Sequence, residues 1–442
     1  MLSVIWLIRD AKNAASDATI MMQMLQGSEY ELIIINDDPH DPPEFVNSDD
    51  SVEIRQHDET KGLVPSFLEG VNLAHGDELL FLESHYYMQS SGLEILRRCL
   101  SEPGVGAVAP VTLMGLHNWV KHRKPYQTLE ELRAYTEEVA QDASLRPRPV
   151  LLLDGGCMLV RREAYDAVQG LDPRYTSSDC AFGDFTLRLL SAGWQILSAE
   201  NSYLHKNPAT IDEDVPGDRA RFREKLGFDI IYSCFTRREL LHYVDLSHQS
   251  NASLDVGCSC GGNLCQLHTD DPSAELYGIE FNKHAAAIAR HFASVDAIDV
   301  ETLHRPEWHD KFQNIILADL LEHLRDPWQA LRNMYRITRP GGRIIISIPN
   351  IMHISILRSL LNSDWNYADA GILDRTHLRF FTRKTATAMV TGAGYHILQY
   401  GSSLPGQSEE ERSLKEKLLP LLGPDASADD LDAYQWHIVA EK

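Results

Sequence analysis

A short strand that runs directly into a glycine-rich turn is the feature that most restricts how this chain folds. Ser253–Val256 is suited to a buried strand, and the chain continues as Gly-Cys-Ser-Cys-Gly-Gly into a helical segment. Gly257 and Gly261 carry no Cβ atom, so the backbone there can approach a ligand closely. Ser259 occupies the third position of a GxGxxG pattern, where a dinucleotide fingerprint requires glycine. The turn therefore predicts a ligand-binding α/β domain and counts against NAD.

Further motifs follow this turn in a regular order. Candidate strands alternate with helices at Ser253–Val256, Leu276–Ile279, Asn314–Ala318 and Arg343–Ile348. This alternation predicts a doubly wound sheet. Glu280 ends the second strand, where an acid can accept from both hydroxyls of a ribose. Asp299 suits a contact with an adenine edge at the end of the third strand. The segment 319–324 and a Pro-Gly-Gly turn at 340–342 come next.

This ordered series resembles the class I S-adenosylmethionine-dependent methyltransferases over about residues 241–400. The resemblance implies that S-adenosylmethionine is the cofactor, with its amino-acid part on Asp255 and the glycine turn. It further implies that Glu280 holds the ribose and Asp299 the adenine. The implied cofactor-binding residues are Asp255, Gly257, Cys258, Ser259, Gly261, Glu280, Phe281, Asp299, Val300, Asp319 and Leu320. The alternative is a Rossmann-like domain that binds another nucleotide or none.

Three histidines are candidates for action on a methyl acceptor. The sulfonium of the cofactor is already activated, so alignment carries much of the step. An alcohol acceptor also gains roughly 10²–10⁴-fold from a general base. His323 follows Asp319 at a helical i+4 spacing, and His353 follows a strand end where acceptors usually sit. His377 lies in the segment 374–381, which is like one in the same methyltransferase subgroup. For each histidine, a structural role is the alternative.

The N-terminal half shows a second α/β pattern. Buried strands are predicted at Val4–Ile8, Glu31–Ile35, Glu78–Leu82, Leu151–Val160 and Gln195–Ala199. The charged, Pro-containing stretch 114–148 is predicted to be an excursion or lid. Acids follow the second strand at Asp37 and Asp38, and Glu83, Ser84 and His85 follow the third. The later order of motifs is Asp154-Gly155-Gly156, then Asp184, and then His205.

This order resembles family 2 glycosyltransferases with the GT-A fold over about residues 2–206. The resemblance implies a sugar-nucleotide donor, with Asp37 on the base and Asp38 and Glu83 also in its site. It implies a divalent metal, Mn²⁺ or Mg²⁺, held at Glu83 and His85, with His205 as a further ligand. An acid near Asp184 would deprotonate the acceptor hydroxyl.

The sequence departs from that family in two places. The Asp-x-Asp-like metal motif is Glu83-Ser84-His85, and a histidine ligand suits Mn²⁺ better than Mg²⁺. If the segment is extended, the first and third of these residues face one ion. The usual Glu-Asp pair is Ala181-Phe182, so Asp179 or Asp184 would have to serve as base. The alternative is an eroded site that binds a sugar nucleotide or glycan without transfer.

The predicted organisation is a GT-A-like domain (1–206), a helical linker (207–249) and a class I methyltransferase domain (250–442), both domains α/β. The leading hypothesis is a bifunctional enzyme that glycosylates an acceptor and O-methylates a sugar hydroxyl. The acceptor would be a glycan, a glycolipid or a glycoprotein. The alternative is a methyltransferase whose degenerate GT-A domain only binds substrate.

Composition narrows the partners and the location. The net charge is −23 over 442 residues, which argues against general binding to nucleic acid or an anionic membrane. No apolar run approaches the roughly 18 residues of a membrane helix. Seven cysteines at irregular spacing indicate a reducing compartment, so we expect a cytoplasmic protein.

Overall fold

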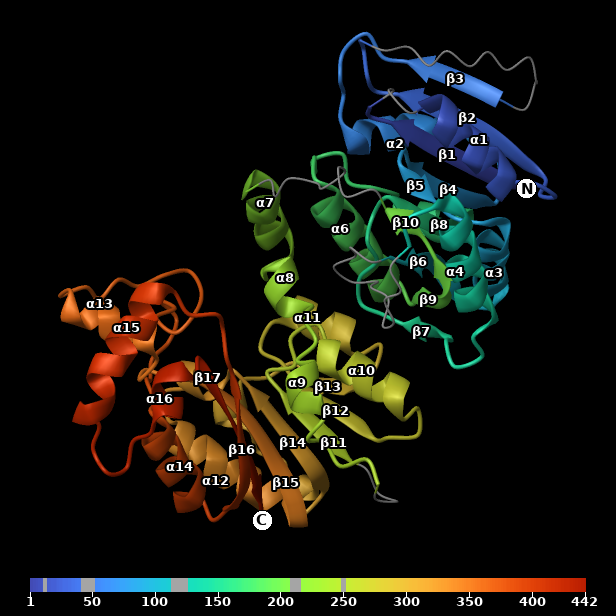
Figure 1. Ribbon diagram of the computed structural model, residues 1–442. Helices are drawn as coiled ribbons and strands as arrows, with labels where there is room; N and C mark the ends of the chain where they lie inside the picture. Colours follow the sequence, from blue (N-terminus) through green and yellow to red (C-terminus); the bar gives the residue numbers. More distant parts are fainter. Residues whose placement is uncertain (11–13, 41–51, 113–125, 207–215, 248–251) are drawn as a thin grey trace. The chain divides into compact units, whose positions relative to one another are not determined.

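The structure is a computed structural model that describes residues 1–10, 14–40, 52–112, 126–206, 216–247 and 252–442 (Figure 1). The chain divides into two compact units, Met1–Cys234 and Phe235–Lys442. Within the described ranges, no helix combines the length and apolar character that crossing a membrane requires.

The first unit alternates strands and helices from its first residues. Its elements are β1 (Leu2–Ile8), α1 (Ala14–Met24), β2 (Tyr30–Asn36), β3 (Val52–Gln56), α2 (Leu63–Leu73), β4 (Glu78–Glu83), β5 (Tyr86–Tyr87), α3 (Ser90–Ser101), β6 (Val105–Val111), α4 (Leu129–Gln141), β7 (Pro147–Pro149), β8 (Cys157–Arg161), α5 (Arg162–Ala167), α6 (Ser178–Ser191), β9 (Gln195–Tyr203), β10 (His205–Lys206), α7 (Pro216–Leu226) and α8 (Ile230–Ser233).

Its main sheet has the strand order β3-β2-β1-β4-β8-β6-β9-β7 in the described residues. The strands from β3 to β4 are parallel, and β8 pairs antiparallel with both β4 and β6. All seven residues of β1 are buried, as expected for a central strand covered on both faces. The rings of Phe67 in α2, Phe81 in β4 and Phe182 in α6 pack edge to face, with ring centroids 5.2–5.9 Å apart. A separate two-stranded ribbon joins β5 to β10.

Several strands of this unit differ from the sequence prediction, which did not contain the short strands β3, β5, β7 and β10. The prediction of one strand over 151–160 is wrong, because β8 starts only at Cys157. Gly156 has a φ of 86° and breaks the extended run, and a Cβ atom there would lie 2.6 Å from the ring of Tyr86. Strand β6 was not predicted, because glycine, alanine and proline interrupt the valines of its sequence Val-Gly-Ala-Val-Ala-Pro-Val. Of the predicted excursion, the described part contains α4 and β7, and β7 pairs with β9.

The second unit contains the glycine turn. Its elements are α9 (Arg238–Leu241), β11 (Ser253–Val256), α10 (Gly262–Asp270), β12 (Leu276–Ile279), α11 (Lys283–Ala289), β13 (Ser294–Asp296), η2 (Val300–Thr302), η3 (Pro306–Trp308), β14 (Phe312–Ala318), η4 (Leu321–His323), α12 (Pro327–Ile337), β15 (Thr338–Pro349), α13 (Ile354–Leu361), α14 (Arg383–Gly392), β16 (His396–Ser403), α15 (Glu409–Leu418), η5 (Leu419–Leu421), α16 (Ala428–Asp432) and β17 (Gln435–Glu441).

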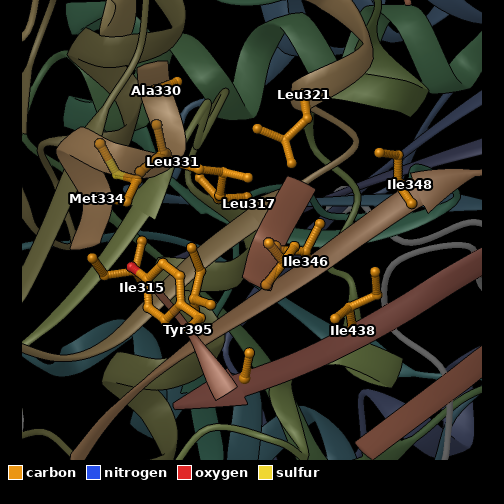
Figure 2. Close-up of a cluster of buried hydrophobic side chains, with 14 of the residues drawn as sticks. Ile315, Leu317, Leu321, Ala330, Leu331, Met334, Ile346, Ile348, Tyr395 and Ile438 are labelled. Atoms are coloured by element: carbon orange, nitrogen blue, oxygen red, sulfur yellow. The ribbon is translucent and has the colours of Figure 1, made fainter. Parts of the chain in front are cut away.

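Its sheet has the order β13-β12-β11-β14-β15-β17-β16 in the described residues. The first five strands in this order are parallel, and β17 pairs antiparallel with both β15 and β16. The strand order reverses beside β11, which is where doubly wound sheets bind ligands at the carboxyl ends of their strands. Figure 2 shows part of the core, where side chains of β14, β15 and β17 meet those of α12. Ile315, Leu331 and Ile346 are fully buried in it.

The residues of the predicted helical linker 207–249 are divided between the two units. Its described residues up to Cys234 belong to the first unit, where Asp218 accepts from the backbone N–H groups of Thr176 and Ser177, both at 2.6 Å. Residues from Phe235 onward belong to the second unit, where the Arg237 N–H donates to Asn263 Oδ1 at 2.8 Å. Residues 207–215 and 248–251 lie outside the described residues.

Candidate functional site

The glycine turn after β11 has a backbone conformation that most side chains disfavour. Gly257 and Gly261 have φ angles of 74° and 87°, and Ser259 between them has a φ of 50°. A Cβ atom on Gly261 would lie 3.0 Å from the Cα atom of Ala289 in α11, so close packing of the two segments also requires glycine here. The turn leads into the N-terminus of α10, whose free N–H groups favour a carboxylate.

Asp255 lies at the base of this turn as a buried acid. Its exposed fraction is 1%, and the side chain of Asn263 lies near enough to act on it, although neither carboxylate oxygen has a hydrogen bond of ordinary geometry among the described residues. Burial raises the pKa of Asp255 to about 7. A buried carboxylate without a donor is costly, so this position suits a ligand that brings its own donor. The amino group of the expected cofactor is such a donor.

Glu280 follows β12 directly and faces the same turn. Its carboxylate oxygens accept hydrogen bonds from the backbone N–H groups of Ser259 at 2.8 Å and Asn282 at 2.7 Å. These bonds orient the carboxylate without saturating it, because an ionised carboxylate has about four acceptor positions. The remaining positions fit the two hydroxyls of a ribose, the role that the sequence predicts for Glu280.

The other predicted cofactor residues nearby differ in exposure. Phe281 is 76% exposed, whereas Cys258 and Val300 are buried. Burial holds the pKa of the Cys258 thiol well above its usual value. Asp299 was predicted to end the third strand, but it lies three residues beyond the end of β13. Its carboxylate accepts from the Glu301 N–H at 2.9 Å and caps η2.

Asp319 binds several groups of the protein itself. Ser347 Oγ donates to its carboxylate at 2.6 Å, Gln435 Nε2 donates at 3.0 Å, and the Arg237 guanidinium forms an ion pair with it. Arg237 precedes α9 and is a residue that the sequence reasoning missed. The next residue, Leu320, packs against the first glycine of the turn. Asp319 therefore joins α9 to the ends of β14, β15 and β17, beside the cofactor turn.

The structure brings together two of the three candidate histidines. The rings of His323 and His377 meet edge to face, with centroids 4.8 Å apart. The predicted helical spacing between Asp319 and His323 is wrong, because Asp319 has a φ of 49° and only the short turn η4 follows. Glu322, which the sequence reasoning assigned no role, lies against the two histidines and is 1% exposed. Burial also lowers the pKa of His323, which favours the neutral ring.

His353 lies in a different environment. It caps the N-terminus of α13, where its ring Nδ1 accepts from the Ser355 N–H at 3.3 Å and lies 2.8 Å from the Ser355 hydroxyl. Its ring packs edge to face on Tyr434, with centroids 5.3 Å apart. Burial lowers the pKa of His353, and its Nε2 has no hydrogen-bond partner in the described part of the chain.

The predicted metal motif of the first unit is folded differently from the prediction. Strand β4 ends at Glu83, and the chain turns at Ser84 and His85, which has a φ of 68°. Both the backbone N–H and the ring Nδ1 of His85 lie 3.1 Å from Asp17 Oδ2, while Glu83 pairs with Arg9 at 3.4 Å. The prediction of one extended segment that aims Glu83 and His85 at the same ion is therefore wrong. Asp17, in the first turn of α1, was missed.

His205 stacks on Tyr87 across the β5–β10 ribbon, with ring centroids 5.8 Å apart. Its Nδ1 lies 2.5 Å from the hydroxyl of Tyr126, and burial lowers the pKa of the ring. Within the described residues, Glu83, His85 and His205 do not gather as three ligands around one position. A metal there would need further ligands, such as the oxygens of a diphosphate.

Asp37, the predicted contact for the nucleotide base, is 1% exposed. Its carboxylate accepts from the N–H groups of Lys61 at 2.7 Å and Gly62 at 2.9 Å, and it lies 2.7 Å from His57 Nδ1. These bonds hold the segment before α2, a role that the sequence did not reveal. Asp38 is half-buried and accepts from the His40 N–H at 3.0 Å.

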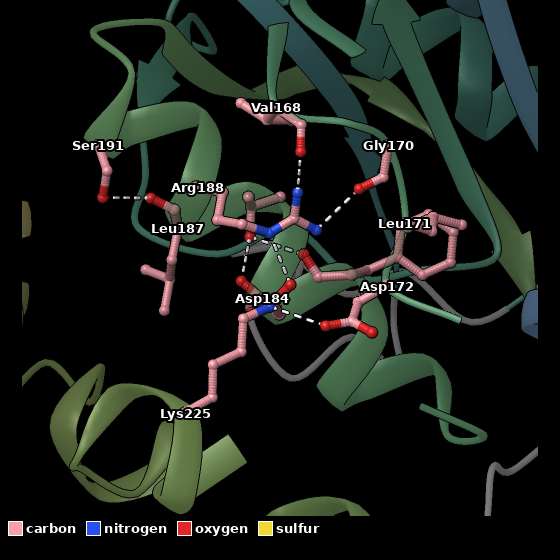
Figure 3. Close-up of polar contacts among 12 residues, drawn as sticks. Val168, Gly170, Leu171, Asp172, Asp184, Leu187, Arg188, Ser191 and Lys225 are labelled. Carbon is pink, nitrogen blue, oxygen red and sulfur yellow. Dashed lines mark hydrogen bonds and ion pairs between the residues drawn. The ribbon is translucent and has the colours of Figure 1, made fainter. Parts of the chain in front are cut away.

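The two candidate bases on α6 differ sharply in exposure. Asp184 is fully buried and pairs with Arg188 Nε at 2.7 Å and with Lys225 Nζ at 2.6 Å (Figure 3). Both oxygens of this carboxylate are engaged, which corrects the prediction that Asp184 could take a proton from an acceptor. Asp179, in the first turn of α6, is exposed. Ala181 and Phe182, where the family pair of acids would stand, are both buried.

Two family profiles match parts of the chain, one in each half. The profile of the family described as Glycosyl transferase family 2 matches residues 18–169, and that described as Methyltransferase domain matches residues 228–400. These matches confirm the predicted fold class, a GT-A-like sheet followed by a Rossmann-like methyltransferase sheet.

Individual relatives match smaller parts. A ubiquinone biosynthesis O-methyltransferase of Aeromonas salmonicida is 25% identical over 147 residues, covering 32% of this chain and 61% of the relative. A ubiquinone biosynthesis O-methyltransferase of Alkalilimnicola ehrlichii is 32% identical over 120 residues, covering 25% of this chain and 47% of the relative. The chain thus spans about half the length of these curated relatives. Among solved structures, GalNAc-T7 with UDP, GalNAc and Mn²⁺ has a TM-score of 0.41 at 13% identity, covering 56% of this chain and 52% of that chain.

Proposed function

Since the chain carries a family 2 glycosyltransferase domain followed by an S-adenosylmethionine-dependent methyltransferase domain, we propose that it glycosylates an acceptor and O-methylates a sugar hydroxyl of the same glycan. The observation that carries the methyl-transfer half is the pair of acids at the glycine turn, Asp255 buried with only the Asn263 side chain beside it and Glu280 only partly bonded. An oxygen acceptor is supported by the curated relatives, which are named O-methyltransferases. A sugar acceptor is supported by the fused glycosyltransferase domain.

The proposed roles follow from the chemistry of each group. The cofactor supplies a methyl group on a positively charged sulfur, and Glu280 would hold its ribose so that this group points at the acceptor. The acceptor hydroxyl must lose its proton as it attacks, and a neutral imidazole is suited to take it. His323 and His353 are both kept neutral by burial. His323, with His377 beside it, follows the segment that packs on the glycine turn, which favours this pair over His353.

Methyl transfer is tested by supplying S-adenosylmethionine with a labelled methyl group, a set of UDP- and GDP-sugars, and glycan acceptors. We expect label in a sugar, detected by mass spectrometry as an added methyl ether. At saturating cofactor, His323→Ala or His377→Ala should slow transfer by roughly 10²-fold or more if that ring is the base. His353→Ala serves as the comparison, with a near-normal rate. Label on nitrogen or carbon would contradict O-methylation.

A second candidate, in which the GT-A-like domain binds substrate without transferring sugar, is favoured by one observation. The two residues that replace the family acids, Ala181 and Phe182, are buried, and Asp184 is engaged on both oxygens. Asp179 then stays as the candidate base on α6. Glycosyl transfer would depend on this exposed acid and on a metal that Glu83 holds together with the diphosphate oxygens of the donor.

A titration with UDP and GDP, with and without Mn²⁺, separates the two candidates. Metal-dependent binding that is lost in Glu83→Ala, together with slow hydrolysis of the nucleotide sugar, is the result expected of a working transferase. Hydrolysis should be lost in Asp179→Asn, whereas Glu163→Gln, an exposed acid on α5, should hydrolyse normally. Binding without metal and without hydrolysis would support the binding-only candidate. Binding of neither nucleotide would exclude a donor site for these two bases.

A further inference from the structure

A carboxylate and two imidazoles converge at the carboxyl end of β14. One ligand atom each of Glu322, His323 and His377 lies within 4.8 Å of the others. The first two residues belong to η4 and the third to a distant loop. The loop is fixed by backbone hydrogen bonds from the N–H groups of Leu378 and Arg379 to the Glu322 carbonyl oxygen, at 2.8 and 3.0 Å. Tertiary structure therefore assembles the cluster, and it does not depend on side-chain contacts alone.

Glu322 is the member of the cluster that calls for a positive charge. It is 1% exposed, and apart from the N–H of Glu322 itself, no group within the described residues donates a hydrogen bond to its carboxylate. The charged groups that act on it are Asp319, Asp374 and Arg237. The first two are acids, and the arginine is already bound by Asp319 and Glu239. A buried carboxylate in such surroundings is costly unless a cation compensates it.

Both histidines use Nδ1 in the hydrogen bonds that hold their rings. His377 Nδ1 lies 2.9 Å from the carbonyl oxygen of Ile372, so Nδ1 carries the proton and donates it. His323 Nδ1 lies 3.3 Å from the carbonyl oxygen of Thr376, which favours the same tautomer. In each ring the lone pair is then left on Nε2. A ring whose second nitrogen donates to a carbonyl oxygen is the usual arrangement of a metal-binding histidine.

We propose that Glu322, His323 and His377 bind one divalent transition-metal cation. Two imidazole nitrogens and one carboxylate form a set that suits Zn²⁺ and Mn²⁺ and that binds Mg²⁺ poorly. Three protein ligands leave coordination positions open, as in catalytic metal sites. The role that we assign to these positions, holding the acceptor oxygen, rests on the proposed methyltransferase function. The binding of the cation does not. With the cation bound, a loss of rate in His323→Ala or His377→Ala would report the loss of a metal ligand, whereas without it the same loss would report a base.

The test is metal binding by the full chain after treatment with a chelator. Calorimetry with Zn²⁺, Mn²⁺ and Mg²⁺ should give one site per chain with affinity in the order Zn²⁺, then Mn²⁺, then Mg²⁺. Co²⁺ should produce visible absorption bands on binding. Glu322→Gln and His377→Ala should each weaken Zn²⁺ binding by at least about 100-fold and remove the bands. His396→Ala, which replaces an exposed histidine of the same unit, should keep both.

Further measurements distinguish the loss of a metal ligand from the loss of folding and from the absence of methyltransferase function. Binding of S-adenosylhomocysteine, measured on each variant, reports whether the second unit is folded. If Glu322→Gln does not fold, His377→Ala, which is only half-buried, carries the test. Absence of a stoichiometric Zn²⁺ site in the parent chain, or unchanged Zn²⁺ affinity in both folded variants, would overturn the proposal. Zn²⁺ binding without any S-adenosylhomocysteine binding would support the metal site and contradict the methyltransferase function.

Discussion

Buried acids in this protein differ in whether the chain itself satisfies them. Asp37 and Asp184 are buried and fully engaged by backbone N–H groups or cations. Asp255 and Glu322 are equally buried, and their oxygens have no hydrogen bond of ordinary geometry from another of the described residues. Satisfied acids stabilise the fold, whereas unsatisfied ones impose a cost that a ligand can relieve. The two unsatisfied acids both lie at the carboxyl ends of parallel strands, where this fold class binds its ligands.

The state of Asp255 predicts how the second unit responds to pH without ligand. Its pKa rises from 3.8 to about 7 on folding, so between these values the native state binds a proton that the unfolded chain has lost. Stability should therefore fall as pH rises through this window, by at most about 4 kcal/mol. Asp255→Asn should remove this dependence, stabilise the unit at pH 8 and weaken cofactor binding. Scanning calorimetry at pH 5 and pH 8 measures it, with Asp270→Asn as the exposed control; an unchanged pH slope in Asp255→Asn would contradict this account.

Helix α6 shows how an element can resemble a catalytic one and still serve the fold. Through Asp184 it is tied to α7, because Lys225 pairs with both Asp184 and Asp172. Arg188 extends the contact by donating to the carbonyl oxygens of Val168 and Gly170 (Figure 3). The helix therefore connects the loop after α5 to α7, which explains why α7 belongs to the first unit.

Removal of the Asp184 charge should therefore change stability first. Asp184→Asn leaves two cations without their buried partner and should destabilise the first unit by about 3–5 kcal/mol. Asp179→Asn, on the exposed first turn of the same helix, should change stability by less than about 0.5 kcal/mol. Chemical denaturation, monitored by hydrogen exchange in α6 and α7, measures the stability of the first unit separately from that of the second. If Asp184→Asn has normal stability but no longer hydrolyses the nucleotide sugar, the structural role is contradicted and Asp184 is the catalytic base.

At the scale of the whole molecule, two transferase domains share one chain. A product of the first domain that stays bound would meet the second at a raised effective concentration, which favours two steps on one glycan. This arrangement supports a sugar as the methyl acceptor.

The sequence was sufficient to predict the features whose residues are adjacent in the chain. Alternating strands and helices, the glycine turn and the acid of Glu280 are readable because each motif is contiguous. Contacts between distant segments were not readable, as with Arg237 and Asp319 or Asp17 and His85. Two residues with positive φ angles also led to wrong predictions, since Asp319 interrupts the expected helical spacing and His85 breaks the segment expected to be extended from Glu83. The grouping of Glu322 with His377 likewise required the folded loop.

The most direct test of the central claim is the affinity of the full chain for S-adenosylhomocysteine, measured by calorimetry on the parent, Glu280→Ala and Glu275→Ala. The parent should bind with a dissociation constant in the micromolar range or below. Glu280→Ala removes the acceptor for two ribose hydroxyls and should lose about 1–3 kcal/mol, or roughly 5- to 150-fold in affinity. Glu275→Ala, an exposed acid just before the same strand, should bind as the parent does. No binding by the parent, or equal binding by the parent and Glu280→Ala, would contradict the account.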